Sequence, residues 1–167
     1  MGTGSTDPRA IDVLAVTAED VVSALEARRQ RGRPVVLRVT PPFSGRMRAR
    51  IHVPVADAPG ATDGGPARET ERDGDTKRDG DRDGEAAPVH VDPDAFVGDA
   101  APAYPRPAET EDALRADPDV EYTVERHHER HRAAVASWRE RVREHFVEET
   151  TVATARGPVD VEVVVLG

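Results

Sequence analysis

The residues of this sequence best suited to chemistry are three histidines close together, His127, His128 and His131. His127 and His131 stand four positions apart, the spacing at which two imidazoles on one helix face can chelate a single metal ion. The run differs from the HExxH motif of zinc proteases, because His128 stands where that motif has glutamate. The favoured interpretation is that these histidines are hydrogen bonded at the rim of a core. The alternatives are a transition-metal site at His127 and His131 with His128 as a third ligand, and a contact that responds to pH.

A second candidate site is a row of arginines, Arg46, Arg48 and Arg50, with apolar residues between them. Strict alternation is typical of a half-buried strand, so the three guanidinium groups are expected on one face. That face could bind an anion or nucleic acid. If the strand pairs with the C-terminal strand, Asp160 and Glu162 could instead form salt bridges with it. Nucleic acid is the less expected partner, because no aromatic residues interleave with the arginines.

Motifs of nucleotide binding and nucleophilic catalysis are absent from the sequence. There is no P-loop, no GxGxxG after a strand, no GxSxG, and no serine with a histidine and a carboxylate near it in sequence. The lack of cysteine excludes disulfides, iron–sulfur clusters and thiolate zinc sites. We therefore expect a small non-catalytic accessory or protein-interaction domain rather than an enzyme, with no cofactor unless the histidines bind a transition metal.

Hydrophobic periodicity predicts an α+β fold built from two similar halves. The first half has a helix capped by Thr17 and strands at 34–40 and 46–53. The second has a helix at 124–148 capped by Thr123, then strands at 150–154 and 159–166. These elements predict a four-stranded antiparallel sheet from two helix–hairpin units, with both helices packed on one face.

The middle of the chain differs in composition from both ends. Residues 56–88 repeat Asp and Gly and contain no Val, Leu, Ile or aromatic residue, so they predict a long disordered acidic insertion. One domain is then expected from residues 9–55 plus 89–167. Within it, residues 89–121 form a partly ordered Pro-rich connector with a short strand at 89–91, a helical turn at 92–97 and a short helix at 111–115 capped by Thr110.

Charge follows the same division. Residues 56–121 carry 19 acidic and seven basic side chains, whereas the chain as a whole has a net charge of −9. Of the 23 basic residues all but Lys77 are arginine, which predicts a haloarchaeal origin. No apolar run is long enough to cross a bilayer and no secretory signal is visible. We expect a cytoplasmic protein without a membrane partner, acting with an unknown protein partner or as a homo-oligomer.

Three segments resemble small haloarchaeal proteins of an uncharacterised family. They are VVLRVTPPFSGRMRARIHV at 35–53, YTVERHHERHRAAVASW at 122–138 and the terminal VDVEVVVLG at 159–167. The resemblance covers the two ends of the chain and not the Asp/Gly-rich insertion. It implies an origin and domain limits, and it implies no catalytic residues, because the family has no assigned activity.

Overall fold

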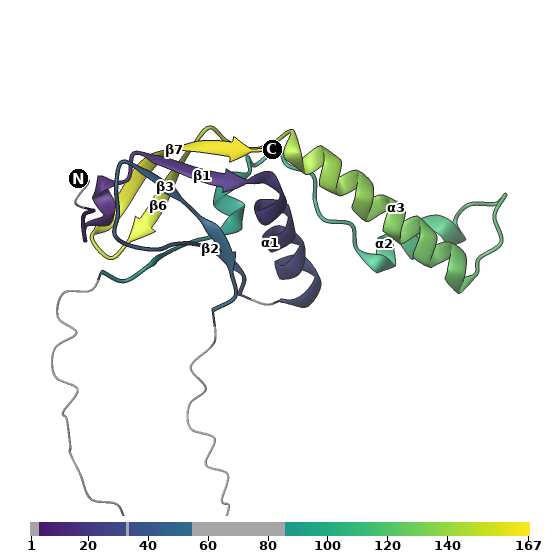
Figure 1. Cartoon of the computed structure of the whole chain (residues 1–167). Coiled ribbons are helices and arrows are strands. Elements are labelled where there is room, and N and C mark those ends of the chain that lie inside the picture. The colour runs from purple at the N-terminus through teal and green to yellow at the C-terminus, as the bar shows by residue number, and fades with distance from the viewer. Residues whose placement is uncertain (1–3, 33, 55–85) are drawn as a thin grey trace, which may run out of the picture.

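The computed structural model describes residues 4–32, 34–54 and 86–167, which form a body of strands from which a pair of helices projects (Figure 1). In chain order the elements are a 3-10 turn η1 (Pro8–Ala10), β1 (Val13–Thr17), α1 (Ala18–Arg31), β2 (Val36–Val39), β3 (Arg46–Arg48), β4 (Arg50–His52), β5 (Val89–Val91), a 3-10 turn η2 (Pro93–Phe96), α2 (Pro107–Arg115), α3 (Val124–Arg143), β6 (Glu149–Thr154) and β7 (Gly157–Leu166).

The strands form two sheets, which confirms the α+β class but not the predicted single antiparallel sheet. The four-stranded sheet has the order β3-β1-β7-β6; β1 runs parallel to both of its neighbours, and β6 pairs antiparallel with β7. The three-stranded sheet is antiparallel, with the order β4-β2-β5. The two predicted hairpins therefore do not join directly into one sheet. Strands β2 and β4 lie in the smaller sheet, and in the larger one a strand absent from the prediction separates β3 from β7.

That strand is β1, the short apolar run directly before α1. Leu14 and Val16 are completely buried in the core, whereas Val13 and Ala15 alternate with them toward the other face. Because β1 pairs with β3 on one side and β7 on the other, it joins the two ends of the chain. A run of five residues next to a helix start gives a weak strand signal, and only its long-range partners fix it as a strand.

The predicted strand at 46–53 is divided between the two sheets. Residues 46–48 form β3 beside β1, and residues 50–52 form β4 beside β2. Ala49 lies between them with no exposed surface and donates its backbone N–H to the carbonyl of Ala15 at 3.0 Å. The small side chain at this position lets the backbone pass through the packed interior from one sheet to the next.

Helix α1 covers the core and begins at the cap that its sequence predicts. The Thr17 hydroxyl accepts from the backbone N–H of Asp20 at 3.1 Å, which is an N-cap. Gly32 ends the helix with φ of 59°, a left-handed conformation in which glycine avoids a Cβ clash. Buried apolar residues of α1 meet those of both sheets in one core, whose largest members are Phe43, Phe96, Leu14 and Leu37.

Helices α2 and α3 lie side by side and project from the body as an arm (Figure 1). The C-terminal half of α3 holds the arm to the body through buried Val135, Trp138 and Val142. Trp138 Nε1 donates to the carbonyl of Pro102 at 2.9 Å, so the Pro-rich segment crosses over the indole. The prediction that both long helices cover one sheet face is therefore wrong, because the first half of α3 packs on α2 instead.

The connector is more ordered than predicted. Strand β5 and the turn η2 match the expected strand at 89–91 and turn at 92–97. Helix α2, however, begins at Pro107, so Thr110 lies inside it and is not its N-cap. Of the predicted disordered insertion, residues 86–88 lead into β5, and the remainder lies outside the described residues.

Candidate anion-binding site

The arginines predicted to share one strand face lie on β3 and β4. Arg46, Arg48 and Arg50 are all exposed. Their strands do not neighbour β7: β1 separates β3 from it, and the Asp160 carboxylate instead accepts from the Thr151 hydroxyl at 2.6 Å. The expected salt bridges to the C-terminal strand are therefore absent from the described residues.

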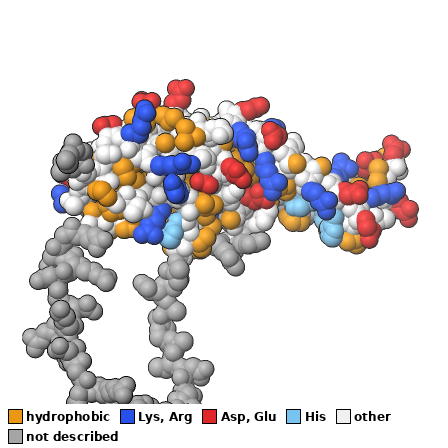
Figure 2. Space-filling model, viewed as in Figure 1, with side chains coloured by type: hydrophobic (Ala, Val, Ile, Leu, Met, Phe, Trp, Pro, Cys, Tyr) orange, Lys and Arg blue, Asp and Glu red, His pale blue; other side chains and the backbone are white. Residues whose placement is uncertain are grey.

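Two of the three arginines meet further polar groups at a hollow of about 470 Å³ beside the three-stranded sheet. We call this the basic hollow; its lining is Arg38, Thr40, Met47, Arg48, Arg50, Ile51 and His52. The lining contains three guanidinium groups and an imidazole but no carboxylate. In Figure 2, arginine side chains and a histidine stand together over the region of β2. Arg46 does not line the hollow.

Register explains how residues far apart in sequence meet there. Arg38 on β2 lies opposite Arg50 on β4 and opposite His90 on β5. Directly opposite residues of an antiparallel pair point to the same side of the sheet. Leu37, the residue before Arg38 on β2, points to the other side of the sheet and is completely buried. The cationic side chains therefore occupy the face away from the core.

Arg38 is the most unusual member of this group. Its Nε is buried and has no hydrogen-bond partner within the described part of the chain. The other such atom, Arg28 Nη1, lies in ion pairs with Asp92 and Asp94. A buried polar donor without an acceptor costs about 1–3 kcal/mol, and more when it is charged. Arg38 is also one of the residues that line the basic hollow.

Several arginines elsewhere in the described chain have carboxylate partners. Ion pairs join Arg29 to Asp94 at 2.7 Å and Arg139 to Glu26 at 2.7 Å. Among the described residues, no ion pair joins a carboxylate to Arg38, Arg48 or Arg50. What distinguishes the basic hollow is that three arginines line it together and that its lining contains no carboxylate.

Two histidines flank Arg38 on this face. The rings of His52 and His90 stack with centroids 5.6 Å apart and an interplanar angle of 27°. Burial lowers the pKa of His90 below its ordinary value, and the neighbouring His52 and Arg38 lower it further. The lowered pKa of His90 thus reflects first its burial and then the positive charge of its neighbours.

The predicted metal cluster lies in the interface between α2 and α3. His127 Nε2 and His131 Nδ1 lie 3.1 Å and 3.2 Å from the Thr110 hydroxyl oxygen. That hydroxyl donates to the carbonyl of Pro107 at 2.9 Å, so its lone pairs remain to accept from both imidazoles. Among the described residues no group of three or more histidine and carboxylate side chains is arranged to hold a metal ion. His128 is exposed on the helix.

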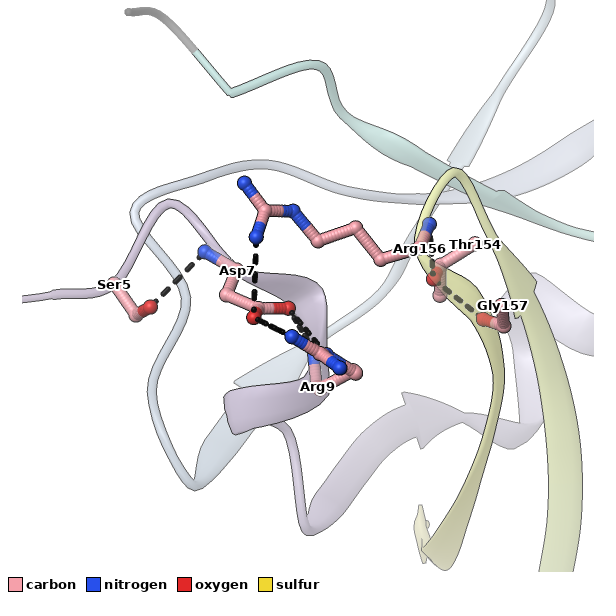
Figure 3. A network of polar contacts seen from close by, with 6 residues as sticks. All are labelled: Ser5, Asp7, Arg9, Thr154, Arg156 and Gly157. Atoms are coloured by element: carbon pink, nitrogen blue, oxygen red, sulfur yellow. Dashed lines mark hydrogen bonds and ion pairs between the residues drawn. The ribbon is translucent and has the colours of Figure 1, made fainter.

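A further ionic network joins the N-terminal turn to the β6–β7 hairpin (Figure 3). The Asp7 carboxylate accepts from Arg9 at 2.7 Å and lies 3.5 Å from Arg156 Nη1. The hydrogen bonds from Arg9 are the main reason that the pKa of Asp7 falls to about 2. One carboxylate thus holds two arginines and joins the N-terminal turn to the hairpin.

The sequence predicted Arg48 and Arg50 as members of the site. It did not predict Arg38, or that His52 and His90 lie beside Arg38. One signal was present: Arg38 is the single charged residue inside the apolar run VVLRV at 35–39. A charged residue in such a run must point away from the core. Its register against β4 could not be read from the alternation alone, because the turn that fixes it was not predicted in detail.

No helix of the described ranges is long and apolar enough to span a membrane. A family model described as Domain of unknown function (DUF8009) matches residues 1–167. No curated protein and no solved structure matches the chain.

Proposed function

The chain belongs to the DUF8009 family, a family of unknown function, and we propose from its own geometry that it is a non-catalytic binding domain whose basic hollow holds an anionic group. The group is a phosphate or a carboxylate, since both match the planar fork of a guanidinium with two parallel hydrogen bonds. The observation that carries the proposal is the buried Nε of Arg38, which has no acceptor among the described residues.

Three features of the surroundings support this function. Arg48 and Arg50 are exposed and line the same hollow, so their side chains are free to close around a ligand. The lining has no carboxylate that would compete with the ligand. The hollow is also open to solvent, so it suits an anionic group attached to a larger partner.

The test is a titration with inorganic phosphate followed by NMR of the arginine Nε–H resonances. Binding at the basic hollow predicts a saturable shift of the Arg38 Nε–H signal. The double substitution Arg48→Ala with Arg50→Ala removes two exposed donors, each contributing about 1.5–3 kcal/mol as a charged hydrogen bond. We therefore expect affinity to fall at least about tenfold, which corresponds to about 1.4 kcal/mol.

The matched control is Arg132→Ala with Arg143→Ala, which removes the same charge from exposed positions on α3. This control should leave phosphate affinity within about twofold at moderate salt, because charges further away than about 10 Å are largely screened. An equal loss in both double variants would show that only net charge matters. That result, or an Arg38 signal that does not move, would refute the proposed site.

A further inference from the structure

Strand β4 is an outer strand of its sheet. The order β4-β2-β5 leaves one side of β4 without a sheet partner in the described structure. Backbone N–H and C=O groups on such an edge are available to pair with another strand. The strand is followed by Val53 and Pro54, and a proline is common where a strand stops.

The side chains of β4 also differ from those of an ordinary solvent-facing edge. Ile51 is 40% exposed and Val53 is 49% exposed, and they are two of the four large hydrophobic residues exposed in the described structure. Arg50 and His52 alternate with them on the opposite face of the strand. The edge therefore presents aliphatic groups on one side and cations on the other, with a period of two residues.

The basic hollow continues this pattern. Ile51 lines it together with Arg48 and Arg50, so an aliphatic side chain borders the cationic groups at this edge of the sheet. None of the chain's Phe, Tyr or Trp side chains is part of the lining. A nucleic-acid surface generally uses such side chains to stack bases, whereas a protein strand needs only main-chain partners and small pockets.

We propose that the β4 edge docks an extended segment of a partner protein in which acidic and aliphatic residues alternate. The segment adds as a further strand, its carboxylates reach Arg48 and Arg50, and its aliphatic side chains cover Ile51 and Val53. This inference rests on the proposed function, since the carboxylates are the anionic groups that the basic hollow receives. Strand addition supplies the affinity through main-chain hydrogen bonds, and the alternation supplies the specificity.

The experiment uses the full chain and two fluorescent ten-residue peptides of five Glu and five Val. One alternates the two residues and the other groups them into blocks. The alternating peptide is expected to bind at least about tenfold more tightly in fluorescence polarisation, because only it places carboxylates and aliphatic groups on opposite faces. Its binding should also protect the amides of residues 50–53 from hydrogen exchange. Equal affinity for both peptides, or no protection of these amides, overturns the inference.

A substitution at the edge provides the second arm. Ile51→Lys places a charge among the aliphatic groups and should abolish binding of the alternating peptide, while Val124→Lys, at a position 54% exposed on α3, should not. Val53→Lys serves the same purpose if the Ile51 variant does not fold. If these edge variants bind the peptide as the unsubstituted chain does, the docking surface is not β4.

The failures of the two proposals can be told apart with inorganic phosphate. Val53 does not line the basic hollow, so Val53→Lys should lose the peptide and keep the phosphate-induced shift of Arg38. That result supports the inference. A chain that binds phosphate but not the alternating peptide overturns the inference and leaves the anion site intact. Tighter binding of a single-stranded oligonucleotide of equal charge would overturn the assignment to a protein strand.

Discussion

Substitution of Trp138 tests how the helical arm is fastened to the body. The indole is 2% exposed, its Nε1 donates to the Pro102 carbonyl at 2.9 Å, and its ring meets that of Tyr104 edge to face at 4.9 Å. Replacing a buried tryptophan by alanine removes about 3–5 kcal/mol of packing free energy. A domain of this size has about 5–15 kcal/mol in total, so Trp138→Ala should lose a large part of its stability.

The assay is urea unfolding followed by far-UV circular dichroism, because the substitution removes the chain's only tryptophan and with it the fluorescence signal. With a denaturant slope of about 2 kcal/mol per molar urea, the midpoint should fall by about 2 M. Val124→Ala on the same helix is the control. Val124 is mostly exposed, so its substitution should change stability by no more than about 0.5 kcal/mol.

The size of the Trp138 effect decides between two accounts of the arm. A midpoint shift below about 0.5 M would mean that the indole contributes less than about 1 kcal/mol, which contradicts its burial. It would then follow that the Pro-rich segment closes over the cavity left by the substitution, and that the arm is held by its other contacts.

Three further predictions concern the polar contacts. Thr110→Val removes the hydroxyl that accepts from two imidazoles, and each of these hydrogen bonds contributes about 0.5–1.5 kcal/mol. Hydrogen exchange of the backbone amides of α2 should therefore become faster. Thr110→Ser keeps the hydroxyl and should leave the exchange rates as in the unsubstituted chain. Asp7→Asn should lower the melting temperature at pH 7, because the ionised carboxylate stabilises the fold above its unfolded pKa near 3.8; the difference from the unsubstituted chain should vanish as pH falls to about 2. A thermal scan in which the difference persists at that pH contradicts the role of Arg9. The pKa of His90 lies below 6.5 in the folded chain, so the unfolded state binds more protons just below that pH, and stability should rise with pH through this window. His90→Gln should flatten that rise in urea midpoints, and phosphate should raise the pKa of His90 measured by NMR by offsetting the charge of Arg38.

Parts of the candidate site could be read from the residues, and parts could not. The alternation at 46–50 correctly indicated that arginines lie on a solvent-facing surface, since period-two alternation is a property of any extended strand. It could not show that the backbone changes sheets at Ala49, because that depends on the space left by β1 and β2. Arg38 enters the site only through its long-range register with Arg50.

The histidines of α3 also show what residue spacing can predict and what it cannot. Their spacing correctly placed His127 and His131 on one face of a helix. Metal binding and structural hydrogen bonding need the same spacing, so the sequence could not choose between them. The neighbour that each imidazole contacts, Thr110, lies on another helix, and only packing brought it there.

The sequence by itself determined the elements whose signals are local. The cap at Thr17, the glycine stop at Gly32, the cap at Thr123 and the β6–β7 hairpin all follow from contacts within a few residues, whose geometry depends little on the rest of the chain. Tertiary structure alone decided which strands pair, because several apolar strands could satisfy one another's hydrogen bonds equally well. The choice was made by burial of side chains from distant segments in one core, and it is this choice that brings three cations together without a carboxylate among them.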